Sequence, residues 1–447
     1  MIKIYDTMTR SLRDFVPLTE NVVNMYVCGP TVYNYIHIGN ARSAVAFDTI
    51  RRYFEYCGYT VNYISNFTDV DDKIIKAANE AGISTKELSD KFITAFMEDT
   101  AQLGIKPATQ NPRVINYMDE IIAFVSILID KGFAYVAEGD VYFRVAKSKN
   151  YAKLANKTLE DLEIGASGRT DAETDRKENP LDFALWKAAK EGEISWESPW
   201  GPGRPGWHIE CSVMATEILG NTIDIHGGGA DLEFPHHTNE IAQSEAKTGK
   251  TFANYWMHNG FVNVDNEKMS KSLGNFVTVH DMLKTVDGQV LRFLLATQQY
   301  RKPINFTEKA IHDAEVNLKY LKNTHSLPLT DQVNQDELQT YLDAFQVAMD
   351  DDFNTANGVT VLFDMAKWIN SGNYDETVKD AFEKMLQVFG IVFEEEVLDE
   401  DIEKLIEERQ AARANKDFAT ADRIRDELAA QGIKLLDTRE GVRWTRD

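Results

Sequence analysis

The fold is decided at residues 24–40, which read Asn-Met-Tyr-Val-Cys-Gly-Pro-Thr-Val-Tyr-Asn-Tyr-Ile-His-Ile-Gly-Asn. The first five residues predict a buried strand, which Gly29 and Pro30 end. An amphipathic helix is expected over residues 37–56, a second strand over residues 60–66 and a second helix over residues 71–81. This alternation is typical of the βαβ units of a parallel, nucleotide-binding sheet.

The loop between the first strand and its helix, residues 29–40, is called the phosphate loop below. It is expected over the carboxyl edge of the sheet at a helix N-terminus, where free amide N–H groups favour phosphate. His37 and Asn40 lie one helical turn apart and would face the same ligand, with Gly39 between them allowing close approach. A His-x-Gly tripeptide at the start of a helix more often caps the helix than takes part in catalysis. The loop alone is therefore weak evidence for a catalytic site.

Two later segments carry metal-ligand residues at metal-ligand spacing. Pro235 is well placed to open a helix, so His236 and Glu240 fall four residues apart on one face. Cys211 begins an apolar-periodic run at residues 211–219, and Cys28 lies at the end of the first strand. Two thiolates, an imidazole and a carboxylate would complete a zinc site.

Other residues compete for this site. His208 lies one turn before Cys211 and could replace it, whereas His237 is rotated by about 100° from the face of His236. The three cysteines could also be spread through the core, since free cysteine is among the most buried residue types. Cys57, at an apparent helix end, is interpreted as such a packing residue.

The composition of the chain is that of an ordinary protein with two to four domains, with 447 residues, 43% of them hydrophobic and 27% charged. No apolar run approaches membrane-spanning length, and three cysteines without a paired framework fit a reducing cytoplasm. The net charge of −23 argues against simple coating of nucleic acid, which depends on Lys and Arg neutralising phosphates. Any nucleic-acid contact is therefore expected on a local basic face.

The middle of the chain reads as an insertion, roughly residues 116–204, with a packed strand at residues 182–187. The sheet resumes at residues 222–226, and three glycines follow it at 227–229. Glycines there let the backbone meet a flat adenine or a ribose, and the carboxylate of Asp231 could accept hydrogen bonds from sugar hydroxyls. A plain turn is the alternative.

Residues 268–275, Lys-Met-Ser-Lys-Ser-Leu-Gly-Asn, are called the lysine loop below. Lys268 and Lys271, interleaved with small hydroxyl residues, suit a mobile loop that brings ammonium charge onto a leaving pyrophosphate. In isolation a merely solvated loop would be the better interpretation; together with the other motifs it is not.

The last third of the chain has a helical period from about residue 311, which predicts a helical bundle. An acidic stretch at residues 394–408 follows, and residues 409–446 then carry nine basic against six acidic side chains. Two short helices and two possible strands suggest a small α/β module there. Trp444 could stack on unpaired bases or serve equally well as a core residue.

Together these motifs resemble the class I aminoacyl-tRNA synthetases, and in detail the cysteinyl-tRNA synthetases. The resemblance covers essentially the whole chain. It is carried by residues 26–33, 37–40, 66–74, 203–211, 226–231, 235–240 and 268–272.

The resemblance implies an α/β fold with a Rossmann-like parallel-sheet catalytic domain split by an insertion, followed by an α-helical bundle and a small C-terminal α/β module. The implied domains are residues 1–115 and 205–260 for the catalytic halves, 116–204 for the connective insertion, 261–310 for the lysine loop and a stem-contact region, 311–393 for a bundle binding the anticodon arm, and 394–447 for an acidic linker and an anticodon-recognition module.

For the metal, the resemblance implies one Zn²⁺ ion per chain on Cys28, Cys211, His236 and Glu240, and so decides against His208 and His237. In the family this metal binds the thiolate of the substrate cysteine. Zinc prefers soft sulfur to the hydroxyl of serine, and such discrimination makes a separate editing site unnecessary.

The remaining site residues are implied in the same way. Cysteine would be bound by Thr68, Trp207 and, through the metal, Cys28; ATP phosphates by His37 and Asn40; adenosine by Gly229 and Asp231; and pyrophosphate by Lys268 and Lys271. His37, Asn40, Lys268 and Lys271 would be the catalytic residues. The chain departs from the family pattern at Asn40, where a second histidine is usual, and at Thr238, where a carboxylate is common.

The expected reaction is ATP-dependent ligation of L-cysteine to its tRNA through cysteinyl-adenylate, with Mg²⁺ accompanying ATP, by a cytoplasmic monomer without a membrane partner. A first alternative is a ligase that joins cysteine to a small amino sugar, against which the basic tail argues. A second is a non-catalytic RNA-binding paralogue, against which the intact residues 268–272 and the complete ligand set argue.

Overall fold

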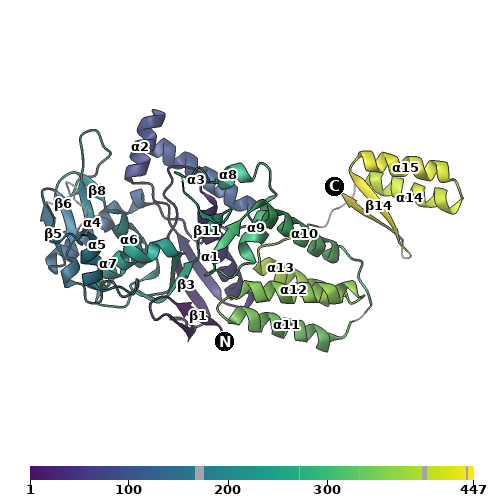
Figure 1. Cartoon of the computed structure of the whole chain (residues 1–447), viewed down its shortest axis with the longest axis horizontal. Coiled ribbons are helices and arrows are strands. Elements are labelled where there is room, and N and C mark those ends of the chain that lie inside the picture. The colour runs from purple at the N-terminus through teal and green to yellow at the C-terminus, as the bar shows by residue number, and fades with distance from the viewer. Residues whose placement is uncertain (167–175, 271, 332, 395–399, 439–440, 447) are drawn as a thin grey trace. The chain divides into compact units, whose positions relative to one another are not determined.

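The computed structural model describes residues 1–166, 176–270, 272–331, 333–394, 400–438 and 441–446. The chain forms two compact units, Met1–Val392 and Phe393–Asp447 (Figure 1). Each is described by itself.

The centre of the first unit is a parallel sheet with the strand order β10-β9-β3-β4, and the predicted α/β fold class is confirmed. Its strands are β3 (Val22–Val27), β4 (Thr60–Ser65), β9 (Ile223–Gly229) and β10 (Ala253–Asn259). Strands β3 and β9 are far apart in the sequence but adjacent in the sheet. The strand order therefore reverses between them, and such a topological switch point is the usual place for a ligand cleft.

Helix α1 (Ile38–Tyr56) follows β3 and packs against β4 and β9, and α2 (Asp72–Ala81) and α3 (Thr85–Gln102) follow β4. The other elements beside this sheet are the hairpin β1 (Lys3–Asp6) and β2 (Ser11–Asp14), and α6 (Trp207–Leu219) and α7 (Thr238–Thr248). Helix α6 begins four residues before the apolar run that predicted it.

The three glycines at 227–229 were expected to follow a strand, and this was wrong: they belong to β9 and pair with β10. The reason is packing. A Cβ on Gly227 would lie 2.3 Å from the Phe47 ring, and one on Gly228 would lie 2.9 Å from the His237 ring, so only glycine lets these rings cover the strand.

The region between α3 and α6, which includes the segment expected to be an insertion, contains η1 (Val114–Tyr117), α4 (Met118–Asp130), α5 (Leu159–Ala166) and an antiparallel sheet of β5 (Ala134–Ala137), β6 (Asp140–Phe143), β7 (Phe183–Ala188) and β8 (Gly203–Pro205). The strand expected at residues 182–187 is β7. One hydrophobic cluster includes Tyr26 of the central sheet and Trp186 of the insertion, so the two share a core.

After the sheet come β11 (Val262–Val264), β12 (Glu267–Lys268), α8 (Val279–Met282), α9 (Gly288–Ala296) and β13 (Ile304–Phe306). The predicted bundle follows as α10 (Glu308–His325), α11 (Gln335–Asp350), α12 (Thr355–Asn370) and α13 (Glu376–Val388). In the part of the chain that the structure describes, no helix has the length and apolarity needed to cross a membrane.

The second unit contains α14 (Glu400–Ala414), α15 (Phe418–Ala430), β14 (Ile433–Thr438) and β15 (Gly441–Arg446). Its core is formed by Ile402, Ile424, Leu428 and Ile433. Trp444 packs against this core, which favours the packing interpretation of that residue over an exposed stacking platform.

Candidate metal centre and active-site cleft

A cleft of about 720 Å³ lies at the carboxyl edge of the central sheet. Its walls bring together most of the residues singled out from the sequence: Cys28, His37, Asn40, Thr68, Trp207, Cys211, Gly229, Asp231, His236 and Lys268. Glu240 is fully buried beside this wall, and Lys271 lies outside the described residues.

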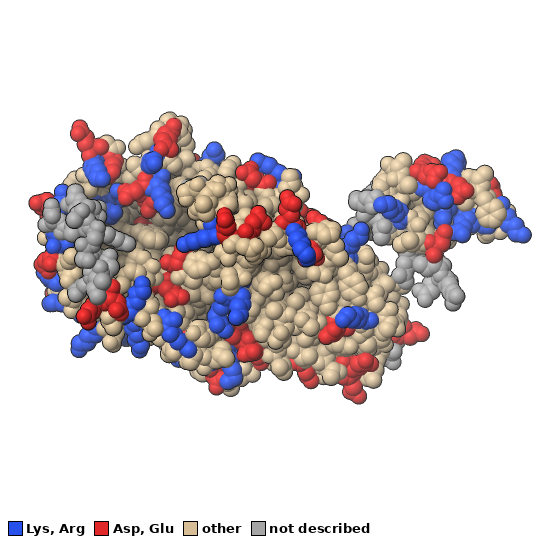
Figure 2. All heavy atoms as spheres, in the orientation of Figure 1, with Lys and Arg blue, Asp and Glu red and all other residues tan. Residues whose placement is uncertain are grey.

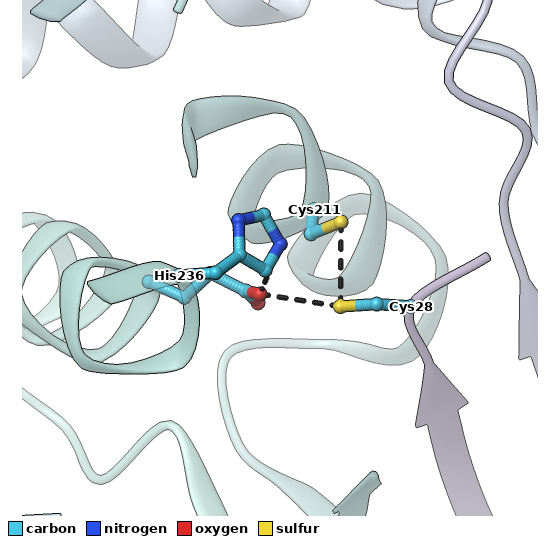
Figure 3. A group of neighbouring side chains, drawn as sticks. Cys28, Cys211 and His236 are labelled. Atoms are coloured by element: carbon cyan, nitrogen blue, oxygen red, sulfur yellow. Dashed lines mark hydrogen bonds and ion pairs between the residues drawn. The ribbon is translucent and has the colours of Figure 1, made fainter. Parts of the chain in front are cut away.

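The side chains of Cys28, Cys211, His236 and Glu240 converge beside the cleft, whose lining includes the first three. Figure 3 shows these three side chains close together. The two Sγ atoms are 3.6 Å apart, Cys28 Sγ lies 3.3 Å from Glu240 Oε1, and His236 Nε2 lies 3.0 Å from the same oxygen. Tetrahedral zinc with bonds of about 2.0–2.3 Å separates its ligand atoms by about 3.3–3.8 Å. The donor set fits zinc, with the two distances from Cys28 Sγ in this range and the His236–Glu240 distance slightly below it.

Three separate elements deliver these ligands. Cys28 follows the end of β3, Cys211 lies on α6, and His236 and Glu240 come from the turn before α7 and its first turn. Phe234 is extended, with φ −142° and ψ 131°, so the helical backbone begins at Pro235. His236 and Glu240 consequently lie one turn apart on the same side.

His237 is not turned away from the site as its helical position suggested. Its Nε2 lies 3.4 Å from Cys28 Sγ, and Cys28, His226, His237 and Glu240 form a second group that could hold a metal. The reason is the sheet order: the rotation that separates His237 from His236 directs it toward β9, and Cys28 lies at the end of the adjacent strand β3. The second group has one sulfur, and His226 and His237 are outside the cleft lining.

Histidines that the spacing argument did not assign orient the ligands. His208 Nδ1 lies 2.9 Å from His236 Nδ1, which leaves His236 Nε2 facing Glu240. His226 Nε2 lies 2.6 Å from Glu240 Oε2. Partners of this kind fix the orientation of metal-binding side chains. Sequence analysis placed His226 in a motif but gave it no role at the metal centre, because its contact joins a strand to a helix.

The electrostatics of the cluster favour a cation. The Cys28 thiol holds the pKa of Cys211 near 6 by hydrogen bonding to it, whereas burial raises the pKa of Cys28 well above its usual value. Burial would raise the pKa of Glu240, but His226 and His236 lower it to about 2. Burial lowers the pKa of His236, but Glu240 and Cys211 outweigh it and raise the value to about 10. Without metal, the Cys211 thiolate and the Glu240 carboxylate carry two negative charges against one positive charge on protonated His236. The remaining negative charge favours a metal ion, which would displace the proton.

The cysteine end of the cleft is shaped by a buried polar network. Thr68 Oγ1 donates to Glu210 Oε2 at 3.3 Å and accepts from Asn66 Nδ2 at 3.2 Å, while Asn66 Oδ1 accepts from the amide of Gly29 at 2.9 Å. Burial raises the pKa of Glu210 well above its usual value. Gly29, which follows Cys28, is thereby linked to Thr68 through the side chain of Asn66. Sequence reasoning identified Thr68 but not Glu210, whose partner is 142 positions away.

Trp207 and His236 stack at the same end, with ring centroids 4.4 Å apart and an interplanar angle of 28°. Trp207 remains 42% exposed, because its other face lines the cleft. Thr238, where the family pattern has a carboxylate, donates its hydroxyl to the backbone oxygen of Glu233 at 2.7 Å.

At the opposite end the phosphate loop forms a capping box. The amide of Asn40 donates to His37 Nδ1 at 3.1 Å, and the amide of His37 donates to Asn40 Oδ1 at 3.2 Å. Capping and cleft lining are therefore combined in the same two residues. A Cβ on Gly39 would lie 2.9 Å from the His37 ring, so glycine permits this close approach.

Gly229 ends β9, and a Cβ there would lie 2.4 Å from Asp231 Oδ1. Lys268 is exposed on β12, with Nζ 5.9 Å from the centre of the Phe261 ring. The cleft lining thus includes two cysteines, the capped N-terminus of α1 and an exposed lysine.

Three family models match consecutive parts of the chain: the class I (C) tRNA synthetase catalytic domain at residues 14–316, the DALR domain at 344–394, and the cysteinyl-tRNA ligase anticodon binding domain at 395–444. The cysteine–tRNA ligase of Streptococcus thermophilus (strain CNRZ 1066) is 96% identical over 447 residues, and that of Streptococcus agalactiae serotype V (strain ATCC BAA-611 / 2603 V/R) is 81% identical; both matches cover 100% of each chain.

Among solved structures, the methionyl-tRNA synthetase of Mycobacterium tuberculosis in complex with methionyl-adenylate has a similar fold. The TM-score is 0.60 at 15% identity, over 82% of this chain and 89% of that chain.

The parallel sheet, its cleft and the match of the catalytic domain define a class I aminoacyl-tRNA synthetase. Members of this class charge tRNA through an aminoacyl-adenylate. From the full-length identities, the chain belongs to the cysteine–tRNA ligase family, and the resemblance noted from its motifs is confirmed.

Proposed function

We propose that the chain ligates L-cysteine to its tRNA through cysteinyl-adenylate, and that Cys28, Cys211, His236 and Glu240 hold a zinc ion by which the substrate thiol is selected. The observation that carries this proposal is the convergence of two sulfurs, an imidazole and a carboxylate at one end of the cleft.

The choice between the two possible ligand groups rests on access. A metal that binds substrate needs an open coordination position facing the cleft. Cys211 and His236 line the cleft, whereas His226 and His237 are in contact with Glu240 and His258 behind it. We therefore assign His226 and His237 to orientation of the ligands.

Zinc held by these residues would favour sulfur over hydroxyl oxygen and promote loss of the thiol proton. The protein supplies the rest of the cysteine pocket: Trp207 closes one side by stacking on His236, and Thr68 offers a hydroxyl held by Asn66 and Glu210. Because these groups are fixed before substrate arrives, they can place the cysteine carboxylate toward the phosphate loop without reorganisation.

For adenylate formation we assign the ATP phosphates to His37 and Asn40, the adenosine to Gly229 and Asp231, and the departing pyrophosphate to Lys268 and Lys271. Mg²⁺ accompanies ATP. His37 is held by its cap to Asn40, and the α1 N-terminus directs backbone N–H groups at the same place. Asn40 uses its carbonyl oxygen in the cap, so its amide N–H groups are the donors it can offer to phosphate.

We further propose that residues 311–393 bind the anticodon arm, that residues 394–447 recognise the anticodon, and that the enzyme acts as a cytoplasmic monomer. Support for the second assignment comes from the match of residues 395–444 to an anticodon binding domain. The excess of basic residues at 409–446 in a chain of net charge −23 suits contact with RNA phosphates.

Cysteine-dependent exchange of pyrophosphate into ATP tests the selection step. Exchange should occur with cysteine and remain near background with serine, because the hydroxyl is a poor zinc ligand. Equal rates with the two amino acids would refute selection through the thiol. Transfer of labelled cysteine to tRNA, and not to glucosamine derivatives, tests the acceptor.

Metal content tests the ligand assignment. After exhaustive dialysis, Cys211→Ser should retain far less than one zinc per chain, while the wild type retains about one. Cys57→Ser is the control, because Cys57 is also a free thiol but is only partly buried and lies outside the cleft lining. Full zinc retention by Cys211→Ser would contradict the assignment.

A further inference from the structure

The phosphate loop is joined directly to the segment that follows the lysine loop. The amide of Ile38 donates to Val277 O at 3.0 Å, and the amide of Val279 donates to Ile36 O at 2.9 Å. His37 and Thr278 are thereby paired as an isolated antiparallel bridge. The chain leaving the lysine loop is thus fixed to the same backbone that carries His37.

An aromatic pair flanks each side of this bridge. His37 and Phe276 meet edge to face, with centroids 5.4 Å apart at 74°. Tyr35 and His280 stack almost in parallel, with centroids 4.1 Å apart at 14°. Each pair joins one residue of the phosphate loop to one residue beyond the lysine loop, and Tyr35, His37 and Phe276 line the cleft.

Helix α3 holds the outer pair in place. His280 Nδ1 lies 3.3 Å from Asp99 Oδ1, and the Phe92 ring meets the edge of Tyr35 at 5.2 Å and 86°. Asp99 and Phe92 both lie on α3, which packs beside α8 (Figure 1). Tyr35 is therefore packed between a ring from α8 and a ring from α3.

Asp99 is a buried carboxylate on α3 whose presence packing alone does not account for. It is 3% exposed, and its Oδ2 has no hydrogen-bond partner among the described residues. A buried carboxylate oxygen without a partner opposes folding. The carboxylate is explained more readily by the interaction of Oδ1 with His280 than by packing.

We propose that Tyr35, His280 and Asp99 form a positioning clasp for adenylate formation, which sets the root of the lysine loop relative to the ATP-binding face of the phosphate loop. The inference rests on the proposed roles of His37, Asn40 and Lys268. None of the clasp residues is a catalytic residue. They act by holding the end of the lysine loop in a fixed position relative to His37 while the loop approaches the leaving pyrophosphate.

The test compares two substitutions of His280 in the full-length, zinc-containing protein. His280→Ala removes the stack and the contact with Asp99, whereas His280→Phe keeps the stack on Tyr35. We expect His280→Ala to lower kcat/KM for ATP in pyrophosphate exchange by about tenfold or more, since small displacements of reacting groups have effects of that size or larger. His280→Phe should recover a large part of the loss, and the KM for cysteine should stay within about twofold because zinc and Thr68 are untouched.

The matched control is His325→Ala. His325 Nε2 also pairs with a carboxylate, Glu383 Oε1, at 2.7 Å, but it lies in the bundle away from the cleft lining. It should leave exchange kinetics unchanged at a temperature where it is folded. Transfer of cysteine from preformed cysteinyl-adenylate to tRNA should proceed at the wild-type rate in His280→Ala.

Three outcomes would overturn the clasp: a kcat/KM for ATP within about twofold of wild type in His280→Ala, an equal rise in KM for cysteine, or no recovery in His280→Phe. If His280→Ala fails to fold, Tyr35→Leu, which removes the same stack from the phosphate-loop side, replaces it, with Tyr35→Phe as the variant that keeps the ring, and the same kinetic split is required. Absence of cysteine-dependent exchange in the wild type would instead refute the proposed function.

Discussion

At the scale of single residues, Glu240 shows how the metal centre is specified. Its Oε1 faces Cys28 and His236, while its Oε2 lies 2.6 Å from His226 Nε2. The His226 ring stacks on Trp256 with centroids 4.4 Å apart at 19°, and this fixes the direction of its Nε2. Oε2 of Glu240 is thereby occupied by its contact with His226, so Glu240 should bind a metal through Oε1 alone.

Removal of this orienting contact should weaken metal binding without removing a ligand. We expect His226→Phe, which keeps a ring against Trp256, to lower zinc affinity by about 10- to 100-fold. Competition with a chromophoric chelator at pH 7 measures the change directly. His312→Ala, a substitution of an exposed histidine on α10, should have no effect. An unchanged affinity in His226→Phe would show that the Glu240 geometry is set by other contacts.

At the scale of elements, α1 connects the nucleotide-binding sheet to the helices after it. Asp48 on α1 accepts hydrogen bonds from Arg292 at 2.6 Å, from Arg52 at 2.8 Å and from the Lys106 amide at 2.9 Å. Arg292, on α9, also donates to the backbone oxygen of Phe389 at the end of α13 at 2.8 Å. A single buried carboxylate therefore joins α1 to α9 and, through Arg292, to α13.

Asp48→Asn should destabilise the first unit by about 3 kcal/mol at pH 7, because it leaves the Arg292 charge buried without its counterion. Burial raises the pKa of Asp48, but Arg292, Arg52 and the Lys106 amide outweigh it and lower the pKa overall. The stabilisation is thus fully present above the unfolded-state pKa of about 3.9 and is lost as the pH falls through the lower folded value.

Urea unfolding of wild type and Asp48→Asn at a series of pH values checks this sign. The difference between the two proteins should be constant from pH 7 to about pH 5 and shrink below about pH 4. Asp380→Asn, which removes an exposed partner of Lys384, should change stability little at any pH. A difference that grows on acidification would contradict the depressed pKa of Asp48.

Periodicity predicted the elements well where local pattern and burial agree. The strands β3 and β4 and the helices α1 and α2 lie within a few residues of their expected positions, and the bundle expected from about residue 311 is formed by α10 to α13. The glycine strand was not predicted, because glycine disfavours strands in isolation and only the rings of Phe47 and His237 explain it.

The residues that orient the metal ligands were missed for the same reason. His226 and His258 belong to the surroundings of the metal centre through contacts with Glu240, His237 and Thr7, and His258 is 251 positions from Thr7. The ligand residues themselves carry strong chemical signals, so spacing could identify them as candidates. The residues that orient them carry none until the fold brings them together.

At the scale of the whole molecule, the net charge of −23 has to be reconciled with binding to RNA. The face in Figure 2 shows Lys and Arg interspersed with Asp and Glu over the first unit. A protein of net charge −23 therefore has to rely on local sites for RNA, and one candidate is the stretch 409–446 within the second unit, where basic residues exceed acidic ones. That unit has its own hydrophobic core, and all residues that line the cleft belong to the first unit.

This division predicts that the two half-reactions separate on truncation after Val392. Because the metal ligands, the phosphate loop and the lysine loop are all retained, cysteine-dependent pyrophosphate exchange should stay within about twofold of the full-length rate. The kcat/KM for tRNA in aminoacylation should fall about tenfold or more, with a shallower dependence on salt, because basic contacts to phosphates are lost. A parallel fall in exchange and aminoacylation would mean that adenylate formation also depends on the second unit, and the assignment of that unit to tRNA recognition alone would be wrong.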